Sequence, residues 1–474
     1  MAESRTIRQL RQALSTLSSA ETEKLTNALE RDRLAGGDMP HELILGLLRP
    51  RLQAQDDTGK KRGGAPTPVR HLCWPFEELL VNKRTGPKHR GRVARTSIMP
   101  VWDWLANDCL PDALDDVSHS IIEHTLAKDA AGLNAATEVL HATCAQAIKE
   151  GLAKASPGSK AKKLLVEKLG GEDVLEDAHE MGLLLEAAPM LSDFKHGMPK
   201  SIEELTPDLA NQVRDLFDVL AEAHADAAPY AAVIAMRHIA KPWQMFRIVK
   251  GVAHTNTDVL ISRTDISIVG ELLLLDMEEA VDCLDVVDPA DDAKETLHRL
   301  KLFTQISRGI TEEIGVRRDG AWATRLMSAR GAVSEIIRER MDRAPTRIMK
   351  ALPMRSTGRF GRGGPSRPDL SQEVDQQAVE RATNTVKFLE GARRYAQAGS
   401  FVGALNEAVT EIDKYLDDYE RTILDELRSE DVAIRDRGES FLDVVSNLVQ
   451  VFRTPDEAAL LRKRGMLAKD SAIA

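Results

Sequence analysis

The chain has 474 residues, of which 43 % are hydrophobic, 29 % are charged and only 4 % are aromatic, and its formal net charge is −10. This balance is typical of a folded protein and excludes a disordered chain, while the acidic excess argues against a globally basic nucleic-acid binder. The scarcity of aromatic residues favours a core of packed helices over a β-sandwich, so we expect an all-α fold in the form of a multi-helix bundle.

The sequence shows no sign of secretion or membrane insertion. The N-terminal segment lacks the apolar core of a signal peptide, and no stretch reaches the roughly 18 apolar residues of a membrane span. The four cysteines lie far apart without a Cys-x-x-Cys pair, which is typical of reduced thiols. Arg outnumbers Lys and Ala is abundant, as in proteins from GC-rich bacterial genomes. We therefore expect a cytoplasmic protein with neither a transmembrane segment nor peripheral membrane contact.

Helical patterns begin near the N-terminus and are interrupted once in the first hundred residues. Residues 1–57 are predicted to form N-terminal helices, with acidic residues in the first turn and basic residues late, as the helix dipole prefers. Residues 58–99 are predicted to be a basic loop region, rich in Gly and Pro, around a short apolar element at residues 71–82.

A long helical section follows. Residues 100–351 are predicted to form a central helical bundle, with Pro100 and Pro111 each opening a helix, because the missing N–H of proline costs nothing in a first turn. Residues 352–370 are predicted to be a Gly/Arg/Pro linker that helix formation cannot tolerate. We place the main domain boundary inside this linker, at residues 353–368.

Residues 371–474 are predicted to form a C-terminal antiparallel three-helix bundle with coiled-coil-like packing. Its middle helix carries an apolar seam with alternating spacings of three and four residues. The seam consists of Val402, Leu405, Val409, Ile412, Leu416, Tyr419 and Ile423. Shorter seams on the neighbouring predicted helices favour burial of this stripe within the bundle. An intermolecular coiled coil is the alternative.

The common catalytic signatures are absent from the sequence, and we expect no cofactor. There is no P-loop, nucleophile elbow, zincin or Cys-x-x-Cys motif. Three Glu-x-x-His pairs place a carboxylate and an imidazole on one helical face, as in ferritin-like di-iron sites. These pairs are Glu138 and His141, Glu176 and His179, and Glu295 and His298. Asp177 and Glu180 beside His179 indicate a solvated acidic face, so we expect satisfied histidines and keep a metal site as a minor alternative.

Two Arg-rich loops are the sharper candidates for an anion- or partner-binding site. One is the basic arm, defined as residues 83–95, and the other is the Gly/Arg/Pro linker. The candidate residues are Lys83, Arg84, Lys88, Arg90, Arg92, Arg95, Arg359 and Arg362. Such loops can follow a phosphate backbone, but the acidic stretch between Asp276 and Glu295 offers an anion within the same chain. We therefore expect the basic arm to fold onto that stretch or to remain solvated. An acidic protein partner, and a nucleic acid or an anionic membrane surface, are the alternatives.

The leading functional hypothesis is a non-enzymatic helical interaction protein, a scaffold or regulatory adaptor that binds a protein partner or associates with itself. Abundant amphipathic helices and the lack of a chemical motif favour it. A nucleic-acid-associated factor that uses the basic loops is the first alternative. A helical metalloenzyme with Glu-x-x-His ligands is the second.

Overall fold

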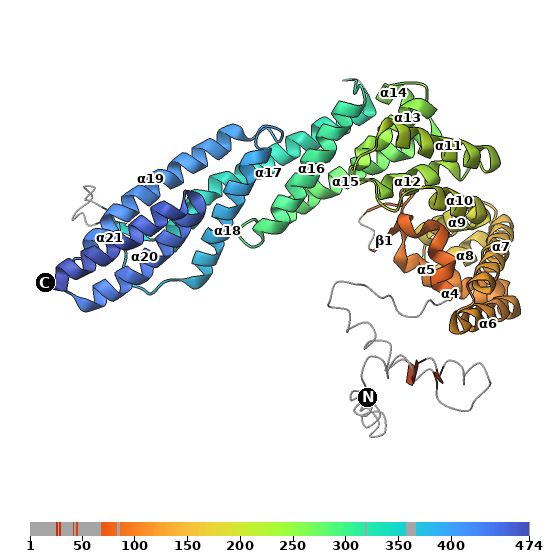
Figure 1. Cartoon of the computed structure of the whole chain (residues 1–474), viewed down its shortest axis with the longest axis horizontal. Helices are drawn as coiled ribbons and strands as arrows, with labels where there is room; N and C mark the ends of the chain where they lie inside the picture. The colour runs from red at the N-terminus through yellow and green to blue at the C-terminus, as the bar shows by residue number, and fades with distance from the viewer. Residues whose placement is uncertain are drawn as a thin grey trace. The chain divides into compact units, whose positions relative to one another are not determined.

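The computed structural model describes residues 68–82, 86–317, 320–356 and 366–473, together with residues 25, 26, 28, 29, 41, 44 and 45. The predicted N-terminal helices of residues 1–57 lie almost entirely outside the described residues. The chain divides into two compact units, Met1–Ala240 and Lys241–Ala474. Both are built from helices (Figure 1), so the predicted all-α fold is confirmed. Among the helices that can be described, none combines the length and apolar character that a membrane crossing requires.

The first unit contains nine described α-helices, two short irregular helical segments and one pair of two-residue parallel strands. Its elements are α4 (Pro68–Cys73), η1 (Trp74–Leu79), β1 (Leu80–Val81), β2 (Val93–Ala94), α5 (Arg95–Trp104), η2 (Leu105–Cys109), α6 (Pro111–Ala127), α7 (Ala130–Lys154), α8 (Lys160–Leu169), α9 (Glu172–Glu186), α10 (Ala188–Gly197), α11 (Pro207–Ala223) and α12 (Ala228–His238).

Helix α12 is the core of this unit. All of its residues from Ala228 to Met236 are buried, as expected of a helix that is apolar on every side. Helix α11 and the segment η1 pack against α12, while α7 packs against α6 and α9. Local signals set the helix ends: the Thr206 side chain accepts a hydrogen bond from Leu209 N at the start of α11, and Gly170 ends α8 in the left-handed conformation.

Helix α5 begins at Arg95, five residues before the predicted start at Pro100. A buried carboxylate of α9 fixes this earlier start: Asp177 Oδ2 accepts hydrogen bonds from Ala94 N at 3.2 Å and from Ser97 Oγ at 2.6 Å. An anion at a helix N-terminus stabilises the first turn. Because Asp177 is 80 residues away from Ser97 in sequence, the local pattern could not show it. The predicted start of α6 at Pro111 is confirmed.

The second unit is a set of long helices with a few short elements. Its elements are η3 (Pro242–Met245), α13 (Phe246–Val252), α14 (Asp258–Ile261), η4 (Asp265–Ser267), α15 (Ile268–Val286), α16 (Ala293–Glu313), α17 (Ala321–Ala351), β3 (Met354–Ser356), β4 (Ser366–Pro368), α18 (Gln376–Ala392), η5 (Arg393–Tyr395), α19 (Val402–Glu426), α20 (Val432–Phe452) and α21 (Pro455–Ile473).

The predicted apolar seam lies on α19 and is buried within this unit. Leu405, Ile412, Leu416, Tyr419 and Ile423 are buried, whereas Val409 is half-buried and Val402 is exposed. Helix α19 packs against α17, α20 and α21, and Figure 1 shows α19, α20 and α21 side by side. The interpretation that the seam is buried inside a bundle is therefore confirmed, but one predicted neighbour is wrong: α18 packs against α17 and α20, while α17 and α21 join α20 around α19.

The predicted main boundary at residues 353–368 does not separate the two units. The division follows Ala240 instead, near Pro242, where α12 has ended and η3 begins. Helices α17 and α18, which flank the predicted linker, pack against each other, and β3 pairs with β4 in antiparallel register. Composition identifies the break in helix, but it cannot show whether the flanking helices meet.

Replacing Ile412 with Ala should lower the free energy of unfolding by about 2–5 kcal/mol, because a fully buried side chain is removed from the bundle and a cavity remains. Urea unfolding of the full chain, followed by far-ultraviolet circular dichroism, measures the change. Val402→Ala on the same helix is the matched control and should change stability by less than about 0.5 kcal/mol, because Val402 is exposed. Equal effects of the two substitutions would contradict the burial of the seam.

Candidate functional site

The described part of the basic arm is held inside the first unit. The ammonium group of Lys88 lies 2.9 Å from Glu180 Oε2 and 3.3 Å from Asp177 Oδ1, and the side chains of all three residues are at most 8 % exposed. Asp177 and Glu180 on α9 were expected on a solvated acidic face, and that expectation is wrong. Lys88 has its acidic partners on α9, not in the predicted stretch between Asp276 and Glu295.

Backbone hydrogen bonds complete the contact between the arm and α9. Lys88 Nζ donates to the carbonyl oxygens of His89 at 2.9 Å and Arg92 at 2.8 Å, and Gly91 N donates to Glu180 Oε1 at 3.3 Å. Burial raises the pKa of Glu180, while the Lys88 ammonium acts in the opposite direction. The three charged groups thus satisfy one another and fix the backbone around residues 88–94.

The other candidate cations of the arm occupy different environments. Arg90 Nε donates to Tyr230 Oη at 3.3 Å, and its guanidinium lies 5.0 Å from the centre of the Tyr230 ring. Arg92 is buried, and Arg95 is exposed at the start of α5. The remaining four candidates lie outside the described residues: Lys83, Arg84, Arg359 and Arg362. Binding of an external anion by these residues stays a prediction.

Replacing Lys88 with Met should lower the free energy of unfolding by about 3–5 kcal/mol, because two buried carboxylates would lose their cation. The loss should shrink as the pH is lowered, since protonation of Glu180 removes one of the uncompensated charges. Urea unfolding at several pH values measures both effects.

Arg95→Met makes the same kind of change at an exposed position of the arm, and it should cost less than about 0.5 kcal/mol. If Lys88→Met were as stable as the parent chain at neutral pH, the buried ion pair would not hold the arm.

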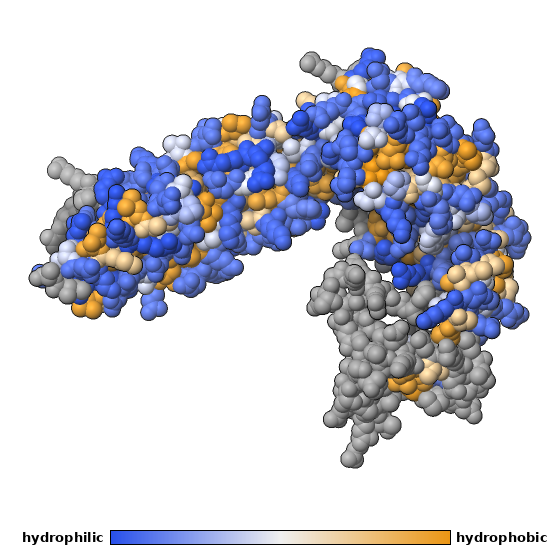
Figure 2. Space-filling model, in the orientation of Figure 1, coloured by the Kyte–Doolittle hydropathy of each residue, from blue (hydrophilic) through white to orange (hydrophobic). Residues whose placement is uncertain are grey.

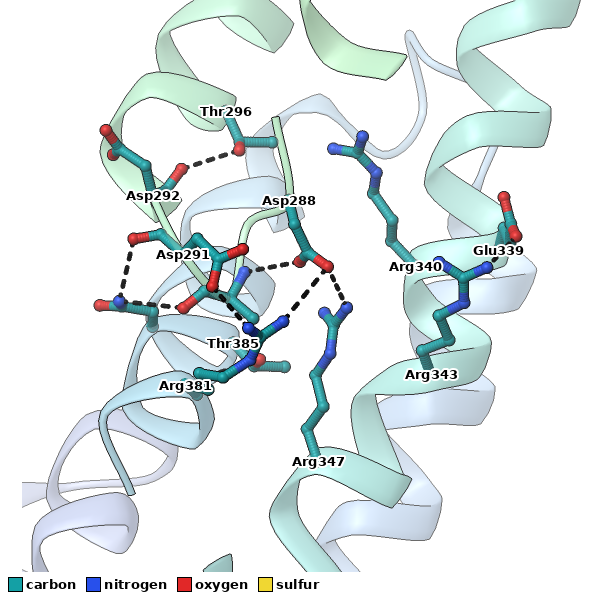
Figure 3. A network of polar contacts seen from close by, with 12 residues as sticks. Asp288, Asp291, Asp292, Thr296, Glu339, Arg340, Arg343, Arg347, Arg381 and Thr385 are labelled. Atoms are coloured by element: carbon teal, nitrogen blue, oxygen red, sulfur yellow. Dashed lines mark hydrogen bonds and ion pairs between the residues drawn. The ribbon is translucent and has the colours of Figure 1, made fainter. Parts of the chain in front are cut away.

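The acidic stretch between Asp276 and Glu295 forms its described ion pairs with arginines of the second unit. Asp288 lies between Arg347 of α17 and Arg381 of α18, as Figure 3 shows, and Arg381 also contacts Asp291 at 2.8 Å. Arg325 of α17 binds Glu278 at 2.7 Å. These acidic side chains therefore connect α15 and the loop before α16 to α17 and α18.

The three Glu-x-x-His pairs do not converge on one site. Glu138 and His141 line a pocket beside α7, His179 lines a different pocket, and Glu295 binds Arg299 of its own helix in the second unit. Within the described ranges, no group of three His, Cys, Asp or Glu side chains is arranged so that it could hold a metal ion. The geometry thus gives no support to the metalloenzyme alternative.

His71 and His141 both line the pocket that contains Glu138. His141 Nε2 is 2.8 Å from the carbonyl oxygen of His71 and must donate to it. Burial is the main cause that lowers the pKa of both imidazoles. The two imidazoles therefore bind protons more readily in the unfolded chain than in the folded chain. As the pH falls below about 6.5, this difference lowers the free energy of unfolding.

A His141→Gln variant should lose less stability than the parent chain between pH 7 and pH 5, because the glutamine amide can still donate to the His71 carbonyl but does not titrate. Chemical unfolding at each pH measures the difference. Glu180, whose raised pKa has the opposite effect on stability, is present in both chains and cancels in the comparison. His119→Gln, at an exposed position on α6, is the control. A parallel pH profile for His141→Gln and the parent would contradict the assignment.

The solvent-facing side of α21 is the strongest candidate for an interaction surface. Leu460, Met466 and Leu467 are 48 %, 68 % and 62 % exposed. Lys463 and Arg464 are also exposed, and neither takes part in an ion pair with any residue that the structure describes, although Arg464 acts electrostatically on Glu420 of α19. We call these five residues the outer face of α21. Figure 2 shows apolar patches among polar residues over the part of the bundle formed by α19–α21.

The opposite side of α21 explains why the outer face is exposed. Ala458, Leu461 and Ala468 are buried against the bundle, in which α21 packs on α20 and α19. The helix is therefore apolar on two sides, only one of which its own bundle covers. These residues lie outside the apolar seams predicted from the sequence, because only one seam was expected on each helix. A helical projection of residues 458–468 would have found the second apolar side.

No protein-family model, curated protein or solved structure matches the chain.

Proposed function

We propose that this chain is a non-enzymatic helical interaction protein, a scaffold or regulatory adaptor, that binds a protein partner through the outer face of α21. The observation that carries the proposal is the combination of three exposed apolar side chains and two cations without an ion-pair partner among the described residues, all on the part of α21 that its own bundle leaves exposed. Contiguous apolar groups with a polar rim mark binding surfaces on proteins that are otherwise polar outside.

The spacing on α21 favours a helical segment of the partner. Leu460 and Leu467 are seven residues apart and share one line along the helix, which is the arrangement of helix-in-groove and coiled-coil contacts. Lys463 and Arg464 lie between them and call for acidic side chains on the partner. We therefore infer an amphipathic partner helix with apolar residues on one side and carboxylates at its edges.

A further observation supports this proposal over the nucleic-acid alternative. Lys88 of the basic arm is neutralised by Asp177 and Glu180, which leaves fewer cations for a phosphate backbone. We also propose a cytoplasmic location, as expected from the sequence.

The double substitution Leu460→Glu and Leu467→Glu should abolish partner binding without unfolding the chain, because both side chains are exposed and the added carboxylates oppose an acidic partner. Affinity capture from the native host, followed by mass spectrometry, identifies the candidate partner. Binding of the two purified proteins is then measured by calorimetry. We expect at least a hundredfold loss of affinity, or about 2.7 kcal/mol, and weaker binding of the parent chain at high salt.

Val286→Glu is the matched control, because Val286 at the end of α15 is 84 % exposed and lies outside α21; this variant should bind the partner as the parent chain does. Light scattering after size-exclusion chromatography tests whether the partner is a second copy. Equal partner binding by the double variant and the control, with unchanged circular dichroism spectra, would refute the role of α21.

A further inference from the structure

A pocket of about 390 Å³ opens between α4, α7, α9 and α10 of the first unit. This volume lies within the range of small-molecule sites. The lining combines an aromatic ring, three imidazoles and two carboxylates with apolar and small polar side chains. Its polar and aromatic members are His71, Trp74, Asn134, Thr137, Glu138, His141, Glu186, Ser192 and His196. Among the described residues that line it, none is Lys or Arg.

The imidazoles present hydrogen-bond acceptors. His141 uses its Nε2–H on the His71 carbonyl at 2.8 Å, and His196 uses its Nδ1–H on the Ser192 carbonyl at 2.7 Å. When neutral, each ring therefore has a lone pair on its other nitrogen. Thr137 Oγ1 donates to Leu133 O at 2.8 Å, so it can only accept from His71 Nδ1, which lies 3.4 Å away. His71 Nε2 is then an acceptor without a hydrogen-bond partner in the described structure, but it is closed off from solvent, so the accessible acceptors are those of His141 and His196.

Glu138 is an exposed residue of the pocket lining, and its carboxylate places a negative charge there. It takes part in no ion pair with any residue that can be described, whereas Glu186 is paired with Lys149 at 2.9 Å. The nearby cation Lys195 is already satisfied: its Nζ bonds to Glu78 Oε2 at 2.5 Å and to the Trp74 carbonyl at 2.7 Å, and it lies 4.6 Å from the Trp74 ring centre.

We propose that this pocket binds a small organic cation, an ammonium or guanidinium group on a short alkyl body. An acceptor-rich lining with an unpaired carboxylate favours a ligand that donates several hydrogen bonds and carries positive charge. The alkyl body finds apolar surface on Trp74, Leu185 and Pro189. The described side chains are not arranged to hold a bare metal ion, which favours an extended cation. The site is independent of the outer face of α21.

Calorimetric titration of the full chain tests the proposal. The probes are n-butylammonium and agmatine, with n-butanol and n-butyrate as neutral and anionic counterparts of the first. We expect the two cations to bind and the two counterparts to show no binding at the same concentrations. Nα-acetyl-lysine amide tests whether the cation can be a protein side chain: its binding would extend the ligand class to peptides, and its failure beside bound n-butylammonium would assign the site to free amines.

Glu138→Gln preserves the shape of the pocket and removes its unpaired charge, so it should weaken the binding of both cations by about five- to tenfold. Glu150→Gln, at an exposed position on the same helix but outside the pocket lining, is the matched control and should bind like the parent chain. Hydrogen exchange should slow in α7 and α10 when a cation is added. Absence of binding by either cation, equal binding of n-butyrate, or unchanged affinity in Glu138→Gln would each overturn the proposal.

Discussion

The conformation of the first unit depends on one buried ammonium group. Lys88 neutralises Asp177 and Glu180, and the same two carboxylates accept backbone hydrogen bonds from Ala94 and Gly91. Because an unpaired buried charge is strongly destabilising, the three groups must be ordered together. Their contact joins the short β1–β2 pair, the start of α5 and the middle of α9 into one structure, and it turns a segment that looks like a mobile cationic loop into part of the core.

The sequence predicted the helices better than it predicted their partners. Spacing alone placed the buried seam from Leu405 to Ile423, because helical periodicity is a local property. It could not show that Asp177 faces Lys88, since sequence distance hides such a contact and adjacent charges usually indicate solvent. The outer face of α21 was not predicted for a related reason. When apolar residues lie on two sides of a helix, they show no single apolar stripe with helical periodicity.

Ion pairs also connect the helices of the second unit. In the described second unit, arginines of α17 and α18 bind the acidic residues around Asp288, and Arg453 joins the turn after α20 to Asp413, Asp417 and Glu420 of α19. Lys463 on α21 and Glu138 in the pocket form no ion pair with any described residue, as is also true of other exposed charges such as Lys387 and Lys414. A complementary charge from outside can bind at such a position without first breaking an internal ion pair.

The antiparallel pairing of β3 and β4 has a consequence for engineering the protein. Met354 is paired with Pro368 and Ser356 with Ser366, so the two ends of residues 357–365 are held at the spacing of neighbouring strands, close to where α17 and α18 pack together. Added chain length between fixed ends costs only about 0.6 kcal/mol for each doubling. A fluorescent domain or an affinity tag inserted there would keep its attachment points together and leave the chain termini unmodified.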